Sequence, residues 1–258
     1  MNSLEKMMSL LDVFTPATPI WSTDDLIQYT GTSPSTCYRY IKILHQAGLL
    51  ARVSGASYIL GPRIMELDRT IRLCDPVYVA GAPAARALTD RTGLSALLCI
   101  LYSDSIMCVH RTLSPDAPPQ LFNRGQKRPL LAGASAKAIL AYLPMHQLRS
   151  IYAKNREGIE SVNLGSTWDL FKKALKRIRA DGYATTTSEY NAGVVSIAAP
   201  LFNAEGDVLG SLAVVTKADT EKGARILEHV PDLLQASEEI SARIATLDMT
   251  ALPARAVG

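Results

Sequence analysis

The segment that most constrains the fold lies between residues 22 and 50, where a short glycine turn separates two amphipathic patterns. Ser33 is a good N-cap and Pro34 suits the first helical position, so a helix is predicted to begin there. Gly48 is a residue type at which helices commonly end. At about 100° per residue, the apolar side of this helix carries Cys37, Tyr40, Ile41, Leu44 and Ala47. The opposite side, predicted to face outward, carries Ser35, Tyr38, Arg39, Lys42 and Gln46.

Two further helices are predicted before this one. The nearer helix covers about residues 22–29, with Ser22 or Thr23 as its N-cap and with Leu26 and Ile27 buried. The farther helix is predicted from apolar residues at helical spacing, namely Leu4, Met7, Met8, Leu10, Leu11 and Phe14. A helix, a short turn and a second helix with an outward basic face form the helix-turn-helix pattern of DNA-binding proteins.

A strand, a glycine turn and a second strand are predicted over residues 49–60, which would form a small wing. The formal net charge is only +3, yet no acidic residue occurs between Asp25 and Glu66. Lysine and arginine neutralise phosphates, while hydroxyl side chains contact phosphates or base edges. The sequence therefore predicts a surface for double-stranded DNA made of Ser33, Ser35, Thr36, Tyr38, Arg39, Lys42, Arg52 and Ser54. The alternative is a plain three-helix domain whose cationic face is only solvated.

Composition and local motifs exclude several other classes. The 258 residues are 48% hydrophobic and 20% charged, which is typical of globular proteins. The first residues are too polar for a signal peptide, and no apolar run approaches the ~18 residues that span a bilayer. We therefore expect a cytoplasmic protein with no membrane partner. The cysteines form no C-x-x-C pair, so reduced thiols and no zinc or redox motif are expected at Cys37, Cys74, Cys99 and Cys108.

No catalytic residue, cofactor or metal site is predicted. The stretch "GASAK" fits neither a G-x-S-x-G elbow nor an S-x-x-K motif, because position 138 is Ala. Cys108 and His110 lie on one strand face and could reach a metal, but a buried strand pair is favoured because further ligands are not evident. A glycine-rich phosphate loop is also missing from the sequence.

The N-terminal motif resembles the winged helix-turn-helix of the IclR-type bacterial transcriptional regulators. The family pattern S-T-x-x-R-x-L-x-x-L-x-x-x-G-L, followed by a wing that ends Y-x-L-G, is matched by Ser35, Thr36, Arg39, Ile41, Leu44, Gly48, Leu49, Tyr58, Leu60 and Gly61. The wing carries a single cation, Arg52, where many relatives have more. The resemblance implies that the DNA partner is an operator.

The resemblance also implies a linker helix over residues 62–75 that joins two domains and helps to pair subunits. Its apolar stripe would be formed by Ile64, Leu67, Ile71 and Cys74. We therefore expect a homodimer or a dimer of dimers. The alternative is an amphipathic connector that packs on its own domain.

Residues 76–250 are predicted to form the larger domain. A helix ends at Gly93, two strands meet at a turn over residues 103–105, and a later hairpin turns at residues 203–206. An exposed helix is predicted from a capping-box-like start at Ser166, and a C-terminal helical region from Gly223 to Leu247 is broken at Pro231. Hairpins flanked by helices imply an antiparallel sheet with helices packed over it.

Family motifs continue in this larger domain. Lys137 and Leu140 match the family's small-residue helix, and a later E-x-x-x-G-x-x-x-I-A-A-P pattern is matched by Glu189, Gly193, Ile197, Ala198, Ala199 and Pro200. The resemblance implies a GAF- or PAS-like effector-binding domain. The predicted fold class is α+β: a winged helix-turn-helix over residues 1–61, the linker helix over 62–75, and the antiparallel-sheet domain over 76–250.

An effector site is predicted at the start of the small-residue helix. Gly133 and Ala134 expose backbone N–H groups at the positive end of the helix dipole and let an anion approach closely. The predicted lining consists of Gly133, Ala134, the hydroxyls of Ser196 and Ser211, and the apolar walls Leu101, Met107 and Leu130. The resemblance implies effector contacts at Gly133, Ala134 and Ser196, whereas Thr186 stands where relatives often have an acid. The alternative is that the small residues only allow tight packing of helix on sheet.

The sequence thus predicts a transcriptional regulator that binds operator DNA and a small organic acid. Repression of a nearby catabolic operon is the first choice and activation is the second. An enzyme or a dimerisation domain fused to a DNA-binding head stays open as a different class.

Overall fold

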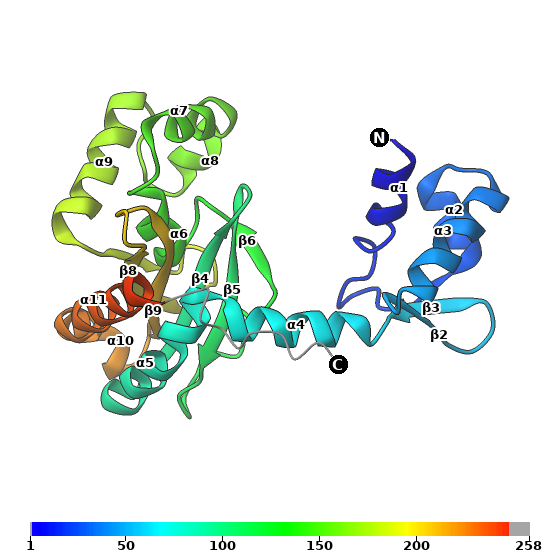
Figure 1. Cartoon of the computed structure of the whole chain (residues 1–258). Helices are drawn as coiled ribbons and strands as arrows, with labels where there is room; N and C mark the ends of the chain where they lie inside the picture. Colours follow the sequence, from blue (N-terminus) through cyan, green and yellow to red (C-terminus); the bar gives the residue numbers. More distant parts are fainter. Residues whose placement is uncertain (1, 248–258) are drawn as a thin grey trace. The chain divides into compact units, whose positions relative to one another are not determined.

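The computed structural model describes residues 2–247, which divide into two compact units, one ending at Leu73 and the other beginning at Cys74 (Figure 1). Each unit is described by itself below. Together they confirm the predicted α+β class, with an N-terminal winged helix-turn-helix and a C-terminal antiparallel-sheet domain.

Among the described residues, the first unit contains two short helices, two longer helices and a small sheet. The helices are α1 (Ser3–Ser9), α2 (Thr23–Thr30), α3 (Pro34–Gln46) and α4 (Arg63–Cys74). The antiparallel sheet has the order β1-β3-β2, with β1 (Trp21–Ser22), β2 (Leu50–Arg52) and β3 (Ser57–Leu60). Strand β1 was not predicted, because two residues are too few to show a period; it pairs Trp21 with Tyr58 of the wing.

The helix-turn-helix core forms largely where the apolar period placed it. Its buried side chains are Leu10, Val13, Leu26, Cys37, Tyr40, Ile41, Leu44 and Leu50. The inward position predicted for Ala47 is wrong, because the helix ends at Gln46 and Ala47 is an exposed C-cap residue. Leu4 and Met8 of α1 are also exposed, and the core begins only at Leu10, after this helix has ended at Ser9.

The N-termini of α2 and α3 begin in different ways. Ser22 caps α2 in a capping box, because its hydroxyl accepts from the Asp25 N–H and the Asp25 side chain accepts from the Ser22 N–H. Ser33 is the N-cap residue of α3, as expected, but its side chain makes no cap hydrogen bond. The Ser33 hydroxyl instead pairs with the hydroxyls of Ser35 and Thr36, at 3.2 and 2.9 Å. The first turn of α3 is therefore left without a side-chain cap.

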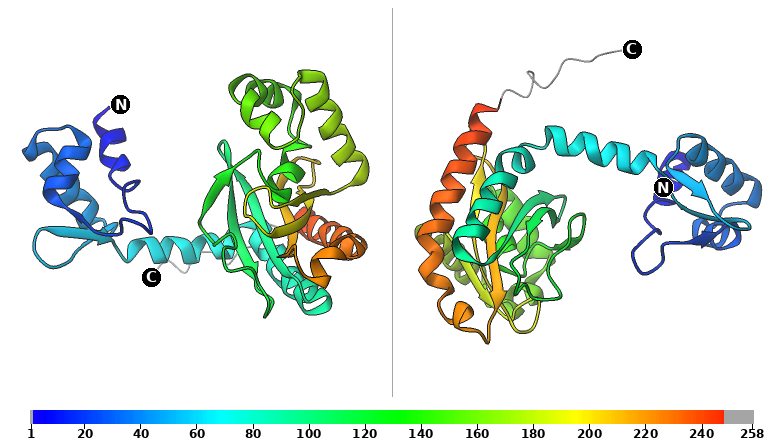
Figure 2. Two further views of the ribbon diagram at one scale, coloured as in Figure 1. Left: turned by 180° about the vertical axis from the view of Figure 1, so that it is seen from behind. Right: turned by 90° about the horizontal axis from the view of Figure 1, so that it is seen from below.

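The second unit is built on a six-stranded antiparallel sheet of order β6-β5-β4-β9-β8-β7. Its strands are β4 (Ser95–Tyr102), β5 (Ser105–Thr112), β6 (Lys127–Pro129), β7 (Ala184–Thr187), β8 (Val194–Phe202) and β9 (Val208–Lys217). Helices α5 (Pro76–Thr92) and α11 (Val230–Thr246) cover one face, as Figure 2 shows. The other face carries α6 (Ala134–Leu140), with α7 (Met145–Lys154), α8 (Arg156–Ser161) and α9 (Trp168–Asp181) beyond it. Short α10 (Glu221–Ala224) and the 3-10 turn η1 (Ile226–His229) precede α11.

Several local predictions for this unit need correction. The N-cap of α9 is Thr167, whose hydroxyl accepts from the Leu170 N–H, and not Ser166. Pro231 stands in the first turn of α11, where a missing N–H costs nothing, so it begins a helix rather than breaking one. Helices α7 and α8 and the short strand β6 were not predicted at all.

Helix α6 lies at the centre of the second unit. All seven of its residues are buried, including the charged Lys137. A helix that is buried all round shows no amphipathic period, and alanine and serine are the side chains that let it lie close to β8 and β9. Its position over the sheet decides where the cavities of this unit lie.

Candidate functional site

The predicted DNA-binding residues form an exposed face on α3 and the wing. Ser33, Ser35, Tyr38, Arg39 and Lys42 are exposed, and Thr36 is half-buried. Among residues 2–247, neither Arg39 nor Lys42 has an ion-pair partner in its own chain. Arg39 and Lys42 lie on the same helix as three hydroxyl side chains and a first turn without a side-chain cap. Such a surface suits contacts to phosphates and base edges.

The wing places its own polar residues at a loop tip. Arg52 and Ser54 are both exposed, and the Arg52 Nε donates to the Gly55 carbonyl at 3.0 Å. This hydrogen bond holds the Arg52 side chain along the turn and leaves the rest of its guanidinium exposed.

Helix α4, at the end of the first unit, has no buried residue. Within its predicted stripe, Leu67 is 42% and Ile71 is 51% exposed, while Ile64 and Cys74 are half-buried. Leu67 and Ile71 thus keep much of their apolar surface exposed.

The second unit contains a small inner cavity of about 50 Å³ between α6 and the sheet. Three of the predicted effector residues line it, namely Gly133, Ala134 and Ser196. The Ser196 hydroxyl pairs with that of Thr186 at 3.0 Å, because the two residues lie opposite each other on β8 and β7. Leu97, Ile106 and Phe122 supply apolar walls.

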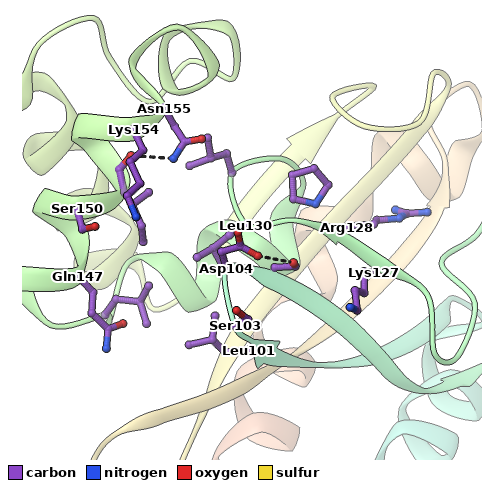
Figure 3. Close-up of a pocket in the computed structure, with 15 residues that line it drawn as sticks. Leu101, Ser103, Asp104, Lys127, Arg128, Leu130, Gln147, Ser150, Lys154 and Asn155 are labelled. Carbon is purple, nitrogen blue, oxygen red and sulfur yellow. Dashed lines mark hydrogen bonds between the residues drawn. The ribbon is translucent and has the colours of Figure 1, made fainter. Parts of the chain in front are cut away.

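The other predicted effector residues lie elsewhere. Leu101 and Leu130 line a larger outer groove of about 790 Å³, shown in Figure 3. Met107 lines neither space, because Ile106 and Cys108 face α6 and strand alternation turns the residue between them to the opposite face. Ser211 is fully buried under α6 but also lines neither space, and its Oγ has no hydrogen-bond partner among the described residues.

The start of α6 is occupied by a carboxylate of the chain itself. One oxygen of Glu189 accepts from the Gly133 N–H at 2.6 Å, and the other accepts from the ammonium of Lys137. Lys137 also donates to the Val162 carbonyl at 2.7 Å. The Lys137 and Glu189 side chains are only 9% and 12% exposed. The N–H group of Gly133, which the sequence offered to an effector anion, is therefore already satisfied.

Sequence reasoning missed the cation of the inner cavity, Arg128. Its guanidinium lies 4.3 Å from the Phe122 ring and 4.2 Å from the Tyr190 ring, so two aromatic side chains hold it. Burial lowers the pKa of Arg128 from its usual value, and its Nε has no hydrogen-bond acceptor among residues 2–247. Its place in the three-residue strand β6 carries no periodic signal that marks it as inward.

The outer groove shares Arg128 with the inner cavity. Its polar rim comes from Gln147, Ser150 and Lys154 on the α7 side and from Ser103 and Asp104 at the β4–β5 turn, and Figure 3 shows these two sets facing each other across the groove. Apolar Leu101 and Leu130 lie on the sheet side.

The described residues contain neither a metal-binding cluster nor a helix that could cross a membrane. Within residues 2–247, no group of three or more His, Cys, Asp or Glu side chains is arranged to hold a metal ion. In the same range, no helix has both the length and the apolar character needed to cross a bilayer.

A winged helix-turn-helix with outward cations, followed by an antiparallel-sheet domain that contains a cavity, is the architecture of a DNA-binding regulator with a ligand-binding domain. Family models agree: "IclR helix-turn-helix domain" matches residues 3–54, and "Bacterial transcriptional regulator IclR C-terminal" matches residues 76–242. The chain belongs to the IclR family of bacterial transcriptional regulators.

Individual relatives are similar over nearly the whole chain. The HTH-type transcriptional regulator KipR of Bacillus subtilis is 26% identical, over 83% of this chain and 85% of that protein. The glycerol operon regulatory protein of Streptomyces coelicolor is 24% identical, over 97% of both. A solved structure of an IclR homologue from Microbacterium hydrocarbonoxydans, complexed with 4-hydroxybenzoate, has a TM-score of 0.72 at 20% identity and covers 97% of this chain and 100% of that one. The names of the first two relatives agree with the family models, and the chain is a transcriptional regulator.

Proposed function

We propose that this regulator represses a catabolic operon. A small organic acid, bound in the second unit, controls the affinity of the protein for its operator. The proposal assigns DNA binding in the cytoplasm to residues 1–61. It assigns subunit pairing to residues 62–75 and effector binding to residues 76–250. Activation of the same kind of operon is the second choice. Two features of the chain carry the proposal. One is a helix with outward cations in the first unit, and the other is a cavity in the second unit. The one arginine that lines this cavity, Arg128, has no hydrogen-bond acceptor for its Nε among the described residues.

The DNA part of the proposal rests on α3. Arg39 and Lys42 project from one exposed face, and the side-chain cap that would close the first turn is missing. A helix N-terminus of this kind suits a phosphate, while an arginine one turn further along suits a base edge in the major groove. Arg39 is thus assigned to base reading and Lys42 to the backbone.

The effector part of the proposal rests on Arg128. A guanidinium binds a carboxylate through two parallel hydrogen bonds, and this one lies close to the rings of Phe122 and Tyr190. We assign the acid group of the effector to Arg128 and its apolar part to Leu97, Ile106 and Phe122. The homologue complexed with 4-hydroxybenzoate supports an organic acid as the class of ligand.

A volume of about 50 Å³ holds little more than water, so the cavity must expand when an effector enters. We infer that this expansion involves Tyr190 and Asn191, which line the cavity from the loop between β7 and β8. The adjoining outer groove reaches Arg128 from the other side and gives the ligand an approach.

The effector assignment is tested by thermal shift and calorimetry with a panel of aliphatic and aromatic carboxylates. Arg128→Gln should abolish binding of any acid that the wild type binds, because the neutral amide keeps the length but loses the charge. Arg124→Gln is the matched control, since Arg124 is a nearby, partly buried arginine that lines neither space. Unchanged affinity in Arg128→Gln would show that the acid binds elsewhere.

The assembly is tested by light scattering. Leu67→Ser should raise the dissociation constant of a dimer, because it removes apolar area from the stripe on α4. Met65→Ser is the control, since Met65 is 71% exposed but projects away from that stripe. A wild-type chain that stays monomeric at micromolar concentration and binds DNA as one copy contradicts this part.

The sign of regulation is tested with a promoter fused to a reporter gene, after DNA fragments selected by the purified protein have identified the operator. Deletion of the regulator should raise reporter expression if it represses and lower it if it activates. Chemical turnover of a bound acid by the purified protein would instead favour the enzyme alternative.

A further inference from the structure

Two cysteines lie directly opposite each other on neighbouring strands beneath α6. Cys99 of β4 is paired with Cys108 of β5 in the antiparallel register. Both side chains are fully buried and belong to the core on the α6 side of the sheet. The thiols therefore point to the same face.

The hydrogen bonds of the backbone show which kind of pair this is. The Cys108 N–H donates to the Gln126 carbonyl at 3.3 Å, and the Cys108 carbonyl accepts from the Gly125 N–H at 2.8 Å. Both polar groups thus point away from β4, so Cys99 and Cys108 form a non-hydrogen-bonded pair. In such pairs the Cα atoms lie about 4.5 Å apart and the side chains are at their closest. Disulfides span Cα separations of about 4.4–6.8 Å, a range that includes this separation. The register of the two strands shifts between Leu98 and Cys99, directly beside the pair.

The surroundings make the two thiols unequal. A hydrogen bond between the side chains of Cys99 and Cys108 raises the pKa of Cys99 and lowers that of Cys108. The charges of Arg111 and Arg128 also lower the pKa of Cys108. Burial acts in the opposite direction, but the pKa of Cys108 is lowered on balance while that of Cys99 is raised. We therefore assign Cys108 as the thiol that more readily becomes a nucleophilic thiolate.

We propose that Cys99 and Cys108 form a modification site at which a hydroperoxide converts the opposed thiols into an intramolecular disulfide. The Cys108 thiolate attacks one oxygen of hydrogen peroxide, breaks the O–O bond and becomes a sulfenic acid. The displaced hydroxide takes up the proton that Cys108 released on ionising and leaves as the first water. The Cys99 sulfur then attacks the Cys108 sulfur, the S–S bond forms, and the hydroxyl leaves as a second water. Two thiols lose two electrons, and hydrogen peroxide is reduced to two waters.

The inner cavity brings the oxidant close to this pair. Leu97 and Ile106, which line the cavity, each precede one of the cysteines by two residues on the same strand face. Ser135 of α6 also lines the cavity, and its hydroxyl bonds to the Cys99 side chain. Oxidation replaces the hydrogen bond between the two thiols by a covalent bond and so changes the sulfur that Ser135 contacts beside the cavity. The exposed face of α3 belongs to the other unit.

The test uses the full-length chain, reduced, freed of reductant under argon and treated with hydrogen peroxide. The protein is then denatured, alkylated with iodoacetamide and mapped by mass spectrometry. Both cysteines fall in one tryptic peptide, because no Lys or Arg occurs between Thr92 and His110, so cleavage before Asp104 is needed to separate them. The expected result is a disulfide-linked pair of fragments containing Cys99 and Cys108, with Cys37 and Cys74 still alkylated. Full alkylation of both, or bridges mainly to Cys37 or Cys74, would overturn the proposal.

Two variants separate the roles of the thiols. In Cys99→Ala, dimedone should trap a sulfenic acid at Cys108, because no partner resolves it. In Cys108→Ala, labelling of Cys99 should be slower by about tenfold. Equal labelling rates would overturn the assignment of Cys108 as nucleophile, and Cys→Ser variants replace the alanines if circular dichroism shows unfolding. None of these measurements depends on an operator or an effector, so the result stands apart from the proposed function.

Discussion

The N-cap residue of helix α3 is Ser33 and that of helix α6 is Gly133, and neither makes a side-chain cap hydrogen bond. The surroundings of the two helix starts nevertheless differ. The first turn of α3 is exposed and has hydroxyls and cations beside it. The Gly133 N–H at the start of α6 is closed by Glu189, a carboxylate 56 residues away in the chain. An uncapped helix start is thus open to an external anion only where the tertiary fold leaves it uncovered. This difference explains why DNA is expected at α3 while the effector acid is assigned to Arg128.

The largest expected effect comes from breaking the ion pair that closes α6. Lys137→Met leaves the Glu189 carboxylate buried without its cation, which should lower the free energy of unfolding of the second unit by about 3–5 kcal/mol. The measurement is urea unfolding followed by tryptophan fluorescence in a Trp21→Phe background, so that Trp168 reports on this unit alone. The double variant Lys137→Met, Glu189→Leu should lose less stability than the single one. A loss below about 1 kcal/mol would show that the pair does not hold this helix start.

The matching change on α3 should leave stability unchanged and weaken DNA binding. Arg39→Ala should cost about 1–3 kcal/mol of operator affinity and relax the preference for one base pair, because an exposed arginine without an internal partner is free to read a base edge. Gel-shift titration against a set of single-base operator variants measures both effects. A uniform loss over all operator variants would move Arg39 from base reading to phosphate contact.

A third change tests why glycine stands at the start of α6. Gly133 has a φ of +89° and a ψ of 156°, a backbone conformation that is almost confined to glycine, although a Cβ there would meet no atom within 4 Å. Gly133→Ala should therefore destabilise the second unit by about 1–3 kcal/mol through strain alone. The same Trp168 unfolding measurement detects it. Ala134→Gly, one residue on, is the control for a change of side chain at the cavity lining; equal losses in both would point to packing instead of backbone strain.

The smallest expected effect is that of Lys42→Ala. A lysine that contacts a phosphate adds affinity without reading sequence, so its loss should weaken all operators alike and reduce the slope of log K against log salt by about one. Gel shifts at several salt concentrations give this slope. Gln46→Ala, on the same outward side but uncharged, should leave it unchanged. An unaltered slope in Lys42→Ala would place this lysine outside the DNA contact.

A change of pH should affect Arg128 and the cysteine pair differently. Burial lowers the pKa of Arg128, yet its guanidinium stays charged near neutral pH because its ordinary value is so high. The lowered pKa of Cys108 instead favours its thiolate as the pH rises. Oxidation of the cysteine pair should therefore be faster in mildly alkaline solution, whereas binding of a carboxylate at Arg128 should not change there.

Much of the first unit could be predicted because its elements have one buried and one exposed face. The spacing of Cys37, Ile41 and Leu44 identified the inner side of α3, and the outward positions Arg39 and Lys42 followed from the same period. The failures lie at helix ends, where Ala47 is exposed and the Ser33 hydroxyl bonds to neighbouring hydroxyls, because periodicity carries no information about the last turn or about a competing partner.

The second unit was predictable in class but less so in its site. Alternation and turn residues indicated the antiparallel sheet and its 203–206 hairpin turn. The contact from Glu189 to Gly133, the aromatic enclosure of Arg128 and the opposition of Cys99 and Cys108 join residues far apart in sequence or depend on strand register. Met107 was misplaced for the same reason, since which residues of β5 face α6 is set by register.

By itself, the sequence determined the class of this protein: local periods, caps and turns define a helix-turn-helix and a sheet domain, because these depend on residues close together in the chain. The tertiary structure alone decided which charged groups have a counter-charge within the chain. Lys137 and Glu189 neutralise each other inside the second unit, whereas Arg39 and Lys42 outside and Arg128 inside lack a counter-charge among the described residues. Whether a charge is paired depends on which distant segments the fold brings within a few ångströms, because the attraction between two charges is strong only at short range.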